Sequence, residues 1–388
     1  MAGIWGNLHV NDAIVFDGRI DELVATVCLN DPRTKAQLRA DAVRALSERA
    51  ARMVCTCGDA HCAGEPPTTD RDLVIHVLAE SSTIDGDGAA PGYVSGFGPI
   101  AADTLRILAA HQGQREDAWR AEQPGKILHE LRVGEYAHLG LIPHTPYYGS
   151  VDATPLWLCL LGAHAAWTGD LALFHELAPQ VEAALIWLDH GGDADGDGYV
   201  EYDGQGGIGL INQGWKDSSN AMVDRDGSLA EAPIRLAEVQ GYVHAARLAV
   251  AELFERAGDH ARGAQQRRAA HALRRRFAHD FWLEDAGTYA MALCGPGDPR
   301  HGPGTPLRSL ASNAGQVLWG GLPSVARARR TAATLMGPAL FSGWGIRTLA
   351  STERAYDPIG YHVGTVWPHD NALIAAGMRR YGLDRAAE

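Results

Sequence analysis

Most of the chain beyond residue 100 consists of long segments in which apolar side chains recur every three or four positions. This spacing gives a helix one apolar stripe, which has to be buried against another element. A chain with many such stripes is restricted to architectures in which helices pack on helices. The expected helices cover 101–113, 152–168, 171–190, 230–257, 260–282, 312–320, 323–336 and 368–381.

The first hundred residues follow a different pattern. Helical spacing is present at 11–27 and 34–54, and the short β-branched run at 72–80 predicts a strand. The stretch "DGDGAAPGYVSGFGP" (85–99) is rich in glycine and proline, which is typical of a boundary between domains. The sequence therefore predicts two domains, 1–100 and 101–388.

Composition excludes several classes of function. The formal net charge of −13 disfavours a broad nucleic-acid surface, because phosphate binding needs a positive face. No run of about 18 apolar residues is present, so we expect no membrane span. The opening "MAGIWGNLHVNDAIVFDG" lacks the features of a secretion signal, and we expect a cytoplasmic protein with reduced thiols.

Three cysteines crowd into the stretch "CTCGDAHC": Cys55, Cys57 and Cys62. With His61 they offer four side chains of the types that bind zinc. The C-x-C-x4-C spacing is not a standard structural zinc pattern, and His61 adjoins Cys62 directly. Ordinary reduced thiols are therefore the favoured interpretation, and a zinc site is the alternative.

From about residue 103 to 388 the chain resembles the catalytic domain of amylo-α-1,6-glucosidases, the glycogen-debranching type of glycoside hydrolase. The resemblance rests on these stretches: "PGKILHELRVGE", "YYGSVDATPLW", "DADGDGYVEY", "NQGWKDSSNAM", "GSLAEAPIRLAEVQGYV", "SGWGIRTLA" and "YHVGTVWPHDNALIAAGMRRYG". Such enzymes have an (α/α)6 barrel of twelve helices in six hairpins. The resemblance implies a mainly α protein with a partial (α/α)6 barrel and a small, mostly helical N-terminal unit.

Residues 1 to about 100 resemble a bacterial domain of unknown function that usually lies upstream of an HNH endonuclease domain. The similar stretches are "DPRTKAQLRADAVRALSERAARMVCTCG", "VIHVLAE" and "GAAPGYVSGFG". No HNH-type set of cysteines and histidines follows, so the resemblance does not extend to nuclease chemistry. The chain thus looks like a fusion of two unrelated partial genes.

The debranching resemblance also implies a catalytic acid. Glycoside hydrolysis uses two carboxyl groups, and inverting enzymes, to which this family belongs, hold them about 6.5–9.5 Å apart. The family's general acid lies in a Gly-Trp-(x)-Asp turn, which makes it Asp217 here. Trp215 would supply an apolar wall, while Lys216 would face away because neighbouring side chains alternate in extended backbone. An isolated W-x-D would instead be read as a solvated turn.

The partner implied by the resemblance is an α-glucan or another oligosaccharide, with no cofactor required. Asp152, and the group formed by Trp367, His369 and Asp370, lie at expected helix starts, where helix capping competes with sugar binding. The stretch "HELR" could line a pocket or form a structural ion pair. The full set of expected sugar-binding residues is Trp215, Lys216, Asp152, Tyr148, Glu130, Gln240, Trp344, Trp367, His369 and Asp370.

The loop "DADGDGYVEYDG" (193–204) resembles a calcium loop. Asp193, Asp195 and Asp197 occupy the first three ligand positions, and Gly198 occupies the turn. The twelfth position is Gly204, where a bidentate glutamate is needed. An acidic, glycine-rich turn without an ion is therefore favoured over a calcium site.

The second carboxylate has no clear counterpart. In the resembled family the catalytic base is a glutamate near the end of the barrel, past the last residue of this sequence. Glu353, Asp357 and Asp370 remain, but none matches that position. We therefore expect a truncated fusion with weak or no hydrolysis, whose unclosed barrel faces promote self-association. The alternative is a non-catalytic fusion protein with an interaction or carbohydrate-binding role.

Overall fold

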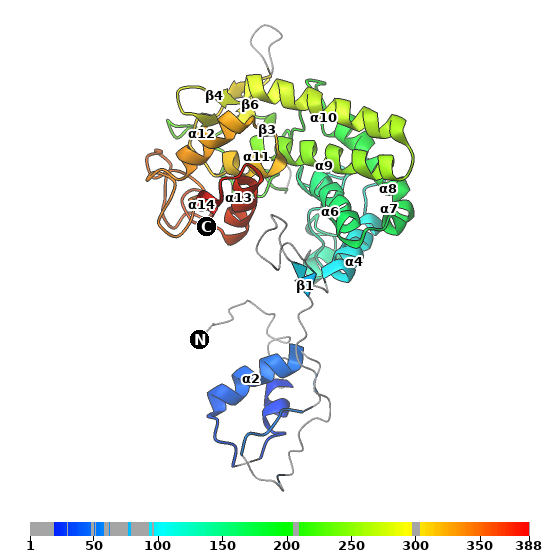
Figure 1. Cartoon of the computed structure of the whole chain (residues 1–388), viewed down its shortest axis with the longest axis vertical. Coiled ribbons are helices and arrows are strands. Elements are labelled where there is room, and N and C mark those ends of the chain that lie inside the picture. Colours follow the sequence, from blue (N-terminus) through cyan, green and yellow to red (C-terminus); the bar gives the residue numbers. More distant parts are fainter. Residues whose placement is uncertain are drawn as a thin grey trace. The chain divides into compact units, whose positions relative to one another are not determined.

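The computed structural model describes residues 19–28, 30–47, 50, 52–57, 62, 77–78, 93–94, 97–204, 209–296 and 303–387. Clustering of the chain gives two compact units, Met1–Ser95 and Gly96–Glu388. In Figure 1 the first is coloured blue and the second runs from cyan to red. Each unit is described by itself below.

The first unit contains a helical turn at 19–24 and helix α2 (Lys35–Ser47). Strand β1 (Val77–Leu78) pairs antiparallel with β2 (Tyr93–Val94). The strand expected at 72–80 is therefore present at 77–78, and the rest of that range lies outside the described residues, as do 11–18 of the first expected helix. The expected helix at 34–54 ends at Ser47, and residues 53–56 adopt no helical structure. Among the described residues, the buried core of this unit is small: Ile20, Leu23, Ala42, Ala45 and Met53.

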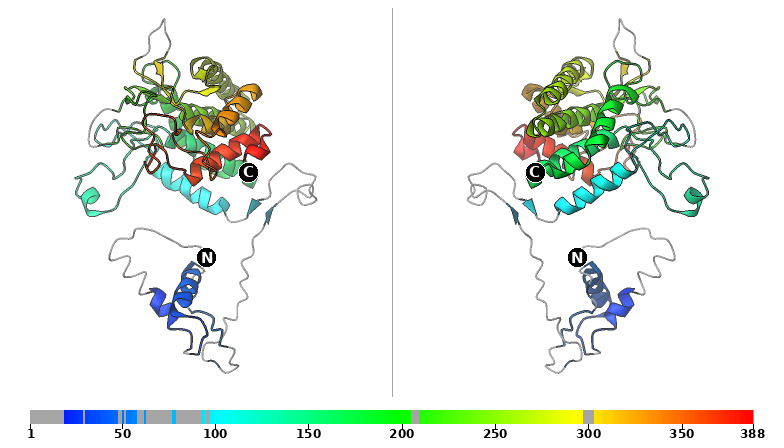
Figure 2. Two further views of the ribbon diagram at one scale, coloured as in Figure 1. Left: turned by 90° about the vertical axis from the view of Figure 1, so that its left-hand side faces the viewer. Right: turned by 90° about the vertical axis from the view of Figure 1, so that its right-hand side faces the viewer.

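The second unit is built from helices that pack in succession. Helices α4 (Phe97–Ala110), α6 (Ala153–Thr168), α9 (Ala237–Arg256), α11 (Asn313–Gly320) and α13 (Pro368–Arg380) each pack on the next. Helices α8 (Ala178–Ile186), α10 (His260–Asp280) and α12 (Val325–Leu335) pack against α6, α9 and α11. This alternation of one inner and one outer helix is visible in Figures 1 and 2 and is that of a partial (α/α)6 barrel.

Helix α9 lies at the centre of this arrangement. It contacts α6, α10 and α11. Its backbone approaches α11 closely, since a Cβ atom on Gly320 would lie 2.4 Å from the carbonyl oxygen of Gly241. Only glycine permits such a contact. The nearly complete burial of α9 explains why polar groups on it, described below, have to find partners inside the protein.

Two expected helices differ from the prediction. The segment 171–190 is divided into α7 (Ala172–Glu176), α8, and the π-helical turn η1 (Trp187–Gly191). Pro179 lies in the first turn of α8, where its missing N–H breaks no helical bond. The segment 230–257 begins with a strand, β3 (Ile234–Leu236), before α9 starts. Pairing with β6 supplies hydrogen bonds that fix the extended form.

The strands of the second unit are short. An antiparallel sheet has the order β3, β6 (Ala292–Cys294), β7 (Thr305–Pro306). A hairpin pairs β4 (Trp282–Leu283) with β5 (Thr288–Tyr289). Two short helices, α5 (Glu135–His138) and α14 (Asp384–Ala387), complete the unit. Among the described residues, no helix combines the length and the apolar character that crossing a membrane requires.

Candidate functional site

The loop that carries Asp217 is held in a fixed shape from within. The buried side chain of Asn212 accepts a hydrogen bond from the Tyr202 hydroxyl (2.9 Å) and donates one to the carbonyl oxygen of Ser218 (2.8 Å). These bonds link the start of the loop to its end. Asp217 lies between them, and 36% of its side chain is exposed. The carboxyl group is thus placed by a rigid loop yet remains open to solvent.

His362 is the nearest titratable neighbour of Asp217. Its Nδ1 atom lies 3.8 Å from Asp217 Oδ1, and it accepts a hydrogen bond from the backbone N–H of Ser218 (3.4 Å). Burial, followed by the charge of Lys216, lowers the pKa of His362 to about 4. The ring is therefore neutral at physiological pH and forms no ion pair with Asp217. Sequence reasoning did not single out this residue; its signal was a histidine in the aromatic-rich stretch "YHVGTVW".

Aromatic rings gather beside this pair. Trp215 packs edge-on against His369 (centroids 4.8 Å apart), His362 (5.4 Å) and Trp367 (6.3 Å). Tyr361 packs against Trp367 at 4.8 Å. We call these five residues the aromatic wall. Because Tyr361 is 61% exposed and His369 is also exposed, the wall offers ring surface to a ligand next to Asp217.

Lys216, the neighbour of Asp217 in the sequence, is completely buried. Its Nζ donates to Asn313 Oδ1 (2.6 Å) and to the carbonyl oxygen of Thr348 (2.8 Å). Asn313 in turn donates to both carboxylate oxygens of Glu238, each at 2.9 Å. Burial lowers the pKa of Lys216 to about 8 and raises that of Glu238 to about 7. This Lys216–Asn313–Glu238 bridge ties the Asp217 loop to α11 and α9.

Asp370 and Gln240 are also completely buried. Asp370 Oδ1 accepts a hydrogen bond from Gln316 (2.5 Å), and burial raises the pKa of the Asp370 carboxyl. The amide of Gln240 bonds to the backbone of Val200, accepting at 3.1 Å and donating at 2.7 Å. Together with Lys216, these residues lie in the interior, whereas the sequence predicted that they contact sugar.

Three further expected sugar-binding residues, Asp152, Tyr148 and Glu130, have hydrogen-bond or ion-pair partners within the protein. Asp152 directly precedes α6 but makes no capping bond, so the capping expectation was wrong; Ser150 Oγ instead accepts from the backbone N–H of Ala153 (3.3 Å). The Tyr148 hydroxyl is satisfied by the carbonyl oxygen of His111 (2.6 Å). Glu130 forms an ion pair with Arg132, the structural alternative expected for "HELR".

Trp344 is the most exposed large apolar side chain of those expected at the site, at 96%. Its loop lies against the segment that enters α13, because Asn371 Oδ1 accepts from the backbone N–H of Ile346 (2.7 Å). A Cβ atom on Gly345 would lie 2.6 Å from the Val366 side chain. The loop of Trp344 therefore packs on the segment that carries Trp367.

Trp367 and Asp370 make no capping bond at the start of α13, so the capping alternative was wrong there too.

An arginine side chain lies among the carboxylates of the acidic loop. Arg235 is completely buried, and its guanidinium group lies 2.5 Å from Asp195, 2.6 Å from Asp197 and 2.8 Å from Glu201. Asp193 accepts from the backbone N–H of Gly198 at 2.9 Å. The three aspartates lie close enough together to hold an ion. However, Asp195 and Asp197 already share a cation of the protein itself.

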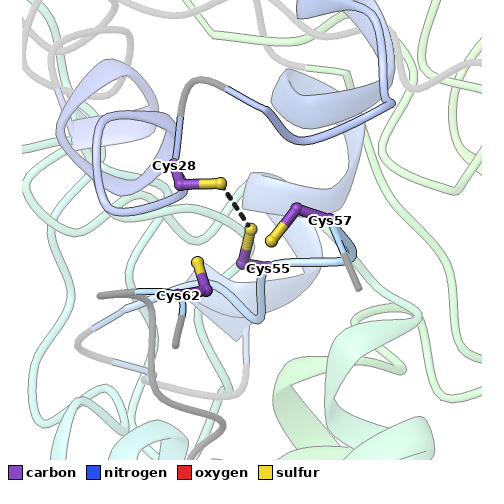
Figure 3. Close-up of side chains that lie close together, drawn as sticks. All are labelled: Cys28, Cys55, Cys57 and Cys62. Atoms are coloured by element: carbon purple, nitrogen blue, oxygen red, sulfur yellow. Dashed lines mark hydrogen bonds between the residues drawn. The ribbon is translucent and has the colours of Figure 1, made fainter. Parts of the chain in front are cut away.

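Asp217 lines neither of two pockets that open on the second unit. The larger has a volume of about 1060 Å³, and the side chains around it include Trp119, Lys126, Glu201 and Tyr202. The smaller, of about 250 Å³, lies between η1 and α10. The remaining candidate ligands, Cys55, Cys57 and Cys62, lie in the first unit, where Cys28 joins them (Figure 3).

Comparison with known proteins gives a separate result for each end of the chain. The model of the mannosylglycerate hydrolase MGH1-like glycoside hydrolase domain matches residues 163–388, and that of a domain of unknown function (DUF222) matches residues 1–123. Two uncharacterized proteins of Mycobacterium tuberculosis H37Rv are similar. Rv2100 is 42% identical over 131 residues, and Rv3776 is 41% identical over 92 residues. These matches cover 33% and 23% of this chain, but only 24% and 17% of those proteins.

Solved structures resemble the second unit. The GH63 mannosylglycerate hydrolase from Thermus thermophilus, in complex with Tris and D-glycerate, aligns with a TM-score of 0.54 and 16% identity. The alignment covers 75% of this chain and 78% of that chain. Its complex with glucose gives a TM-score of 0.52 at the same identity, with 75% and 79% covered. At this identity the likeness shows the fold, which is that of the (α/α)6 glycosidases.

Proposed function

The chain belongs to the mannosylglycerate hydrolase MGH1-like glycoside hydrolase family, and from this premise we propose that it binds a glycoside against the aromatic wall with Asp217 as general acid. The observation that carries this proposal is the placement of Asp217. It is a partly exposed carboxyl group on a rigid loop, and its neighbour His362 belongs to the aromatic wall. Aromatic faces pack well against the apolar faces of sugar rings.

The geometry leaves the Asp217 carboxyl available for proton transfer. The 3.8 Å separation from His362 Nδ1 is longer than a hydrogen bond, and that nitrogen already accepts from Ser218. Asp217 can therefore turn toward the oxygen of a leaving group and protonate it.

A base is needed to activate water. Three carboxylates were considered for this role: Glu353, Asp357 and Asp370. Asp370 and Glu353 are buried, and Glu353 accepts a hydrogen bond from the backbone N–H of Leu310 (3.1 Å). Asp357 alone among these three is exposed, and it lies in the loop that carries His362. We therefore propose slow hydrolysis, with Asp357 as the carboxylate to test for the role of base. General acid–base catalysis contributes about 10²–10⁴-fold per group, so a poorly placed base lowers turnover steeply.

The test uses two substrates. Mannosylglycerate is suggested by the names of the relatives, and a branched limit dextrin is the substrate of a debranching α-1,6-glucosidase. Sugar release is compared for the unchanged chain, Asp217→Asn and Asp357→Asn. We expect Asp217→Asn to lower release by about 10²-fold or more, because an amide cannot act as an acid, with a smaller effect from Asp357→Asn. Release that is unchanged in Asp217→Asn would remove this residue from the site.

A second candidate function is sugar binding without turnover. It is favoured by the 96% exposure of Trp344, which makes that indole available to a long glucan. A fluorescence titration with maltooligosaccharides distinguishes the two candidates. Binding that is weakened by Trp344→Ala, kept in Asp217→Asn, and accompanied by no sugar release supports this candidate. Trp119→Ala is the matched control. Trp119 is also exposed (43%), but it lines the larger pocket instead of the loop of Trp344.

A further inference from the structure

Four cysteines converge in the first unit. Cys28 follows the helical turn at 19–24, Cys55 and Cys57 lie in the segment beyond α2, and Cys62 comes shortly after. Their sulfur atoms all lie within 4.8 Å of one another, and they point toward a common centre in Figure 3. Cys28 is the new member, because 26 residues separate it from Cys55 and its spacing gives no local motif.

We propose that Cys28, Cys55, Cys57 and Cys62 bind one structural zinc ion. Four thiolates in tetrahedral arrangement are a typical closed zinc site, with Zn–S bonds of about 2.3 Å. Such a tetrahedron places sulfur atoms about 3.8 Å apart. The Sγ atoms of Cys28 and Cys55 are 3.3 Å apart, well beyond a disulfide bond, and the structure joins none of these cysteines in a disulfide. Small side-chain movements therefore suffice to complete the coordination.

The surrounding backbone is arranged to hold the ligands in place. Asp31 accepts a hydrogen bond from the backbone N–H of Thr56 (2.8 Å), and Arg33 donates to the carbonyl oxygen of Val54 (2.6 Å). The backbone N–H of Met53 donates to Thr26 Oγ1 at 2.8 Å. These bonds fix the segment after Cys28 beside the segment of Cys55 and Cys57. Hydrogen bonds of this kind, outside the coordination sphere, hold the ligands of a metal site in position.

Metal binding would displace the thiol protons of the four cysteines, because only thiolates act as ligands.

The small core of this unit gives zinc a physical role. Among the described residues of this unit, five apolar side chains are buried, two of them alanines, and so few buried side chains rarely stabilise a domain alone. A zinc ion would link the helical turn at 19–24 to the segment beyond α2, closing a loop of 26 residues between Cys28 and Cys55. Structural zinc supplies folding free energy directly in small domains. The metal is thus expected to stabilise the first unit and to take no part in glycoside chemistry.

The experiment measures metal in the full chain, purified without a metal-binding tag after growth with added zinc. Inductively coupled plasma mass spectrometry should find about one zinc ion per chain. Cys28→Ser should lose most of it, while Cys294→Ser, the same change in the second unit, should keep it. A mercurial reagent should release the zinc as it titrates the thiols. Cobalt added to the metal-free chain should give the charge-transfer and d–d bands of a tetrahedral thiolate site, weakened in Cys28→Ser.

Other outcomes would overturn the proposal. Zinc bound equally by the unchanged chain and Cys28→Ser would place the metal elsewhere. A Cys28–Cys55 disulfide found by mass spectrometry of the unreduced chain would assign the pair to redox chemistry. Stoichiometric iron in place of zinc would overturn the identity of the metal. A chain that binds none of these ions and keeps all its thiols titratable would mean that the cluster is only a group of reduced cysteines.

Discussion

At the scale of single residues, the Asp217 loop is held in place by titratable side chains that are buried. Lys216 and Glu238 are both completely buried and are joined only through Asn313. Burying a charge is costly unless every donor and acceptor is satisfied. Breaking one partner of such a set is therefore expected to destabilise the protein far more than removing both.

Lys216→Met keeps the length of the side chain but removes the ammonium group. It leaves Asn313 Oδ1 and the Thr348 carbonyl without their donor and Glu238 without a nearby positive charge. We expect the free energy of unfolding to fall by about 3–5 kcal/mol, measured by urea denaturation of the second unit. The double variant with Glu238→Gln should lose less than the sum of the two single losses. Strict additivity would mean that the bridge does not couple these residues.

The residues of the site were only partly predictable. Asp217 and Trp215 belong to a contiguous motif, so their neighbours along the chain identify them. Lys216 was expected to face away from Asp217 because side chains alternate; its side chain is buried, whereas that of Asp217 is partly exposed. His362 contacts the loop directly, and Glu238 is connected to it through Asn313. Both lie far from the loop in the sequence, so no local pattern predicts these contacts. Long-range packing also decided the burial of Asp370 and Gln240, whose polar side chains suggest a surface position.

At the scale of elements, polar groups on α9 contribute to its packing. His244 lies on this helix, is 2% exposed, and donates from Nδ1 to the carbonyl oxygen of Gly320 (2.7 Å). It thereby joins α9 to α11 close to the contact between Gly241 and Gly320. Burial lowers the pKa of His244 to about 4, so the ring is neutral when the protein is folded.

This makes the packing of α9 sensitive to acid. In the unfolded chain a histidine has a pKa of about 6.5, so the unfolded state binds the extra proton first as pH falls. The contribution of His244 is fully present above pH ~6.5 and is lost toward pH ~4, by up to about 3 kcal/mol. His244→Asn keeps an N–H donor but cannot titrate. Its urea stability should fall less than that of the unchanged chain between these pH values.

The exposed His138 on α5 provides the control for this experiment. His138→Asn should follow the pH dependence of the unchanged chain. If His244→Asn also follows it, His244 is not the group responsible for the acid sensitivity.

The helical segments were more predictable than the loops. The apolar spacing located α6, α10, α11 and α13 within a few residues, because long amphipathic stripes are strong signals. It missed the division of 171–190 and the strand before α9. There, the first-turn position of Pro179 and the pairing of β3 with β6 override the helical spacing. The strand pairs link segments far apart in sequence, which no local pattern can show.

The acidic loop gives a prediction about calcium. Because the guanidinium of Arg235 already contacts Asp195, Asp197 and Glu201, added calcium or EGTA should leave the melting temperature of the second unit unchanged. Arg235→Met removes the cation from among these carboxylates and should cost about 3–5 kcal/mol. In that variant, calcium should raise the melting temperature. A calcium-dependent shift in the unchanged chain would show that the loop binds the ion beside the arginine.

At the scale of the whole molecule, the division into two units predicts where a protease acts. The stretch 85–99 is rich in glycine and proline in the sequence and joins the unit that ends at Ser95 to the unit that begins at Gly96. Limited chymotrypsin digestion should first cut between about 82 and 100, where Tyr93 and Phe97 offer cleavage sites, because connecting segments are nicked before packed helices. The fragments are identified by mass spectrometry. First cleavage within α9 or α10 would contradict this boundary.

Among the described residues, the buried core of the first unit shares no member with the buried cores of the second. Cooperative unfolding spreads through shared buried contacts, so we expect the two units to unfold in separate steps. A calorimeter should record a small transition and a large one, with enthalpies in rough proportion to the residues that each unit orders. A single melting temperature then describes neither unit. Loss of the smaller unit to heat would still leave the Asp217 loop folded.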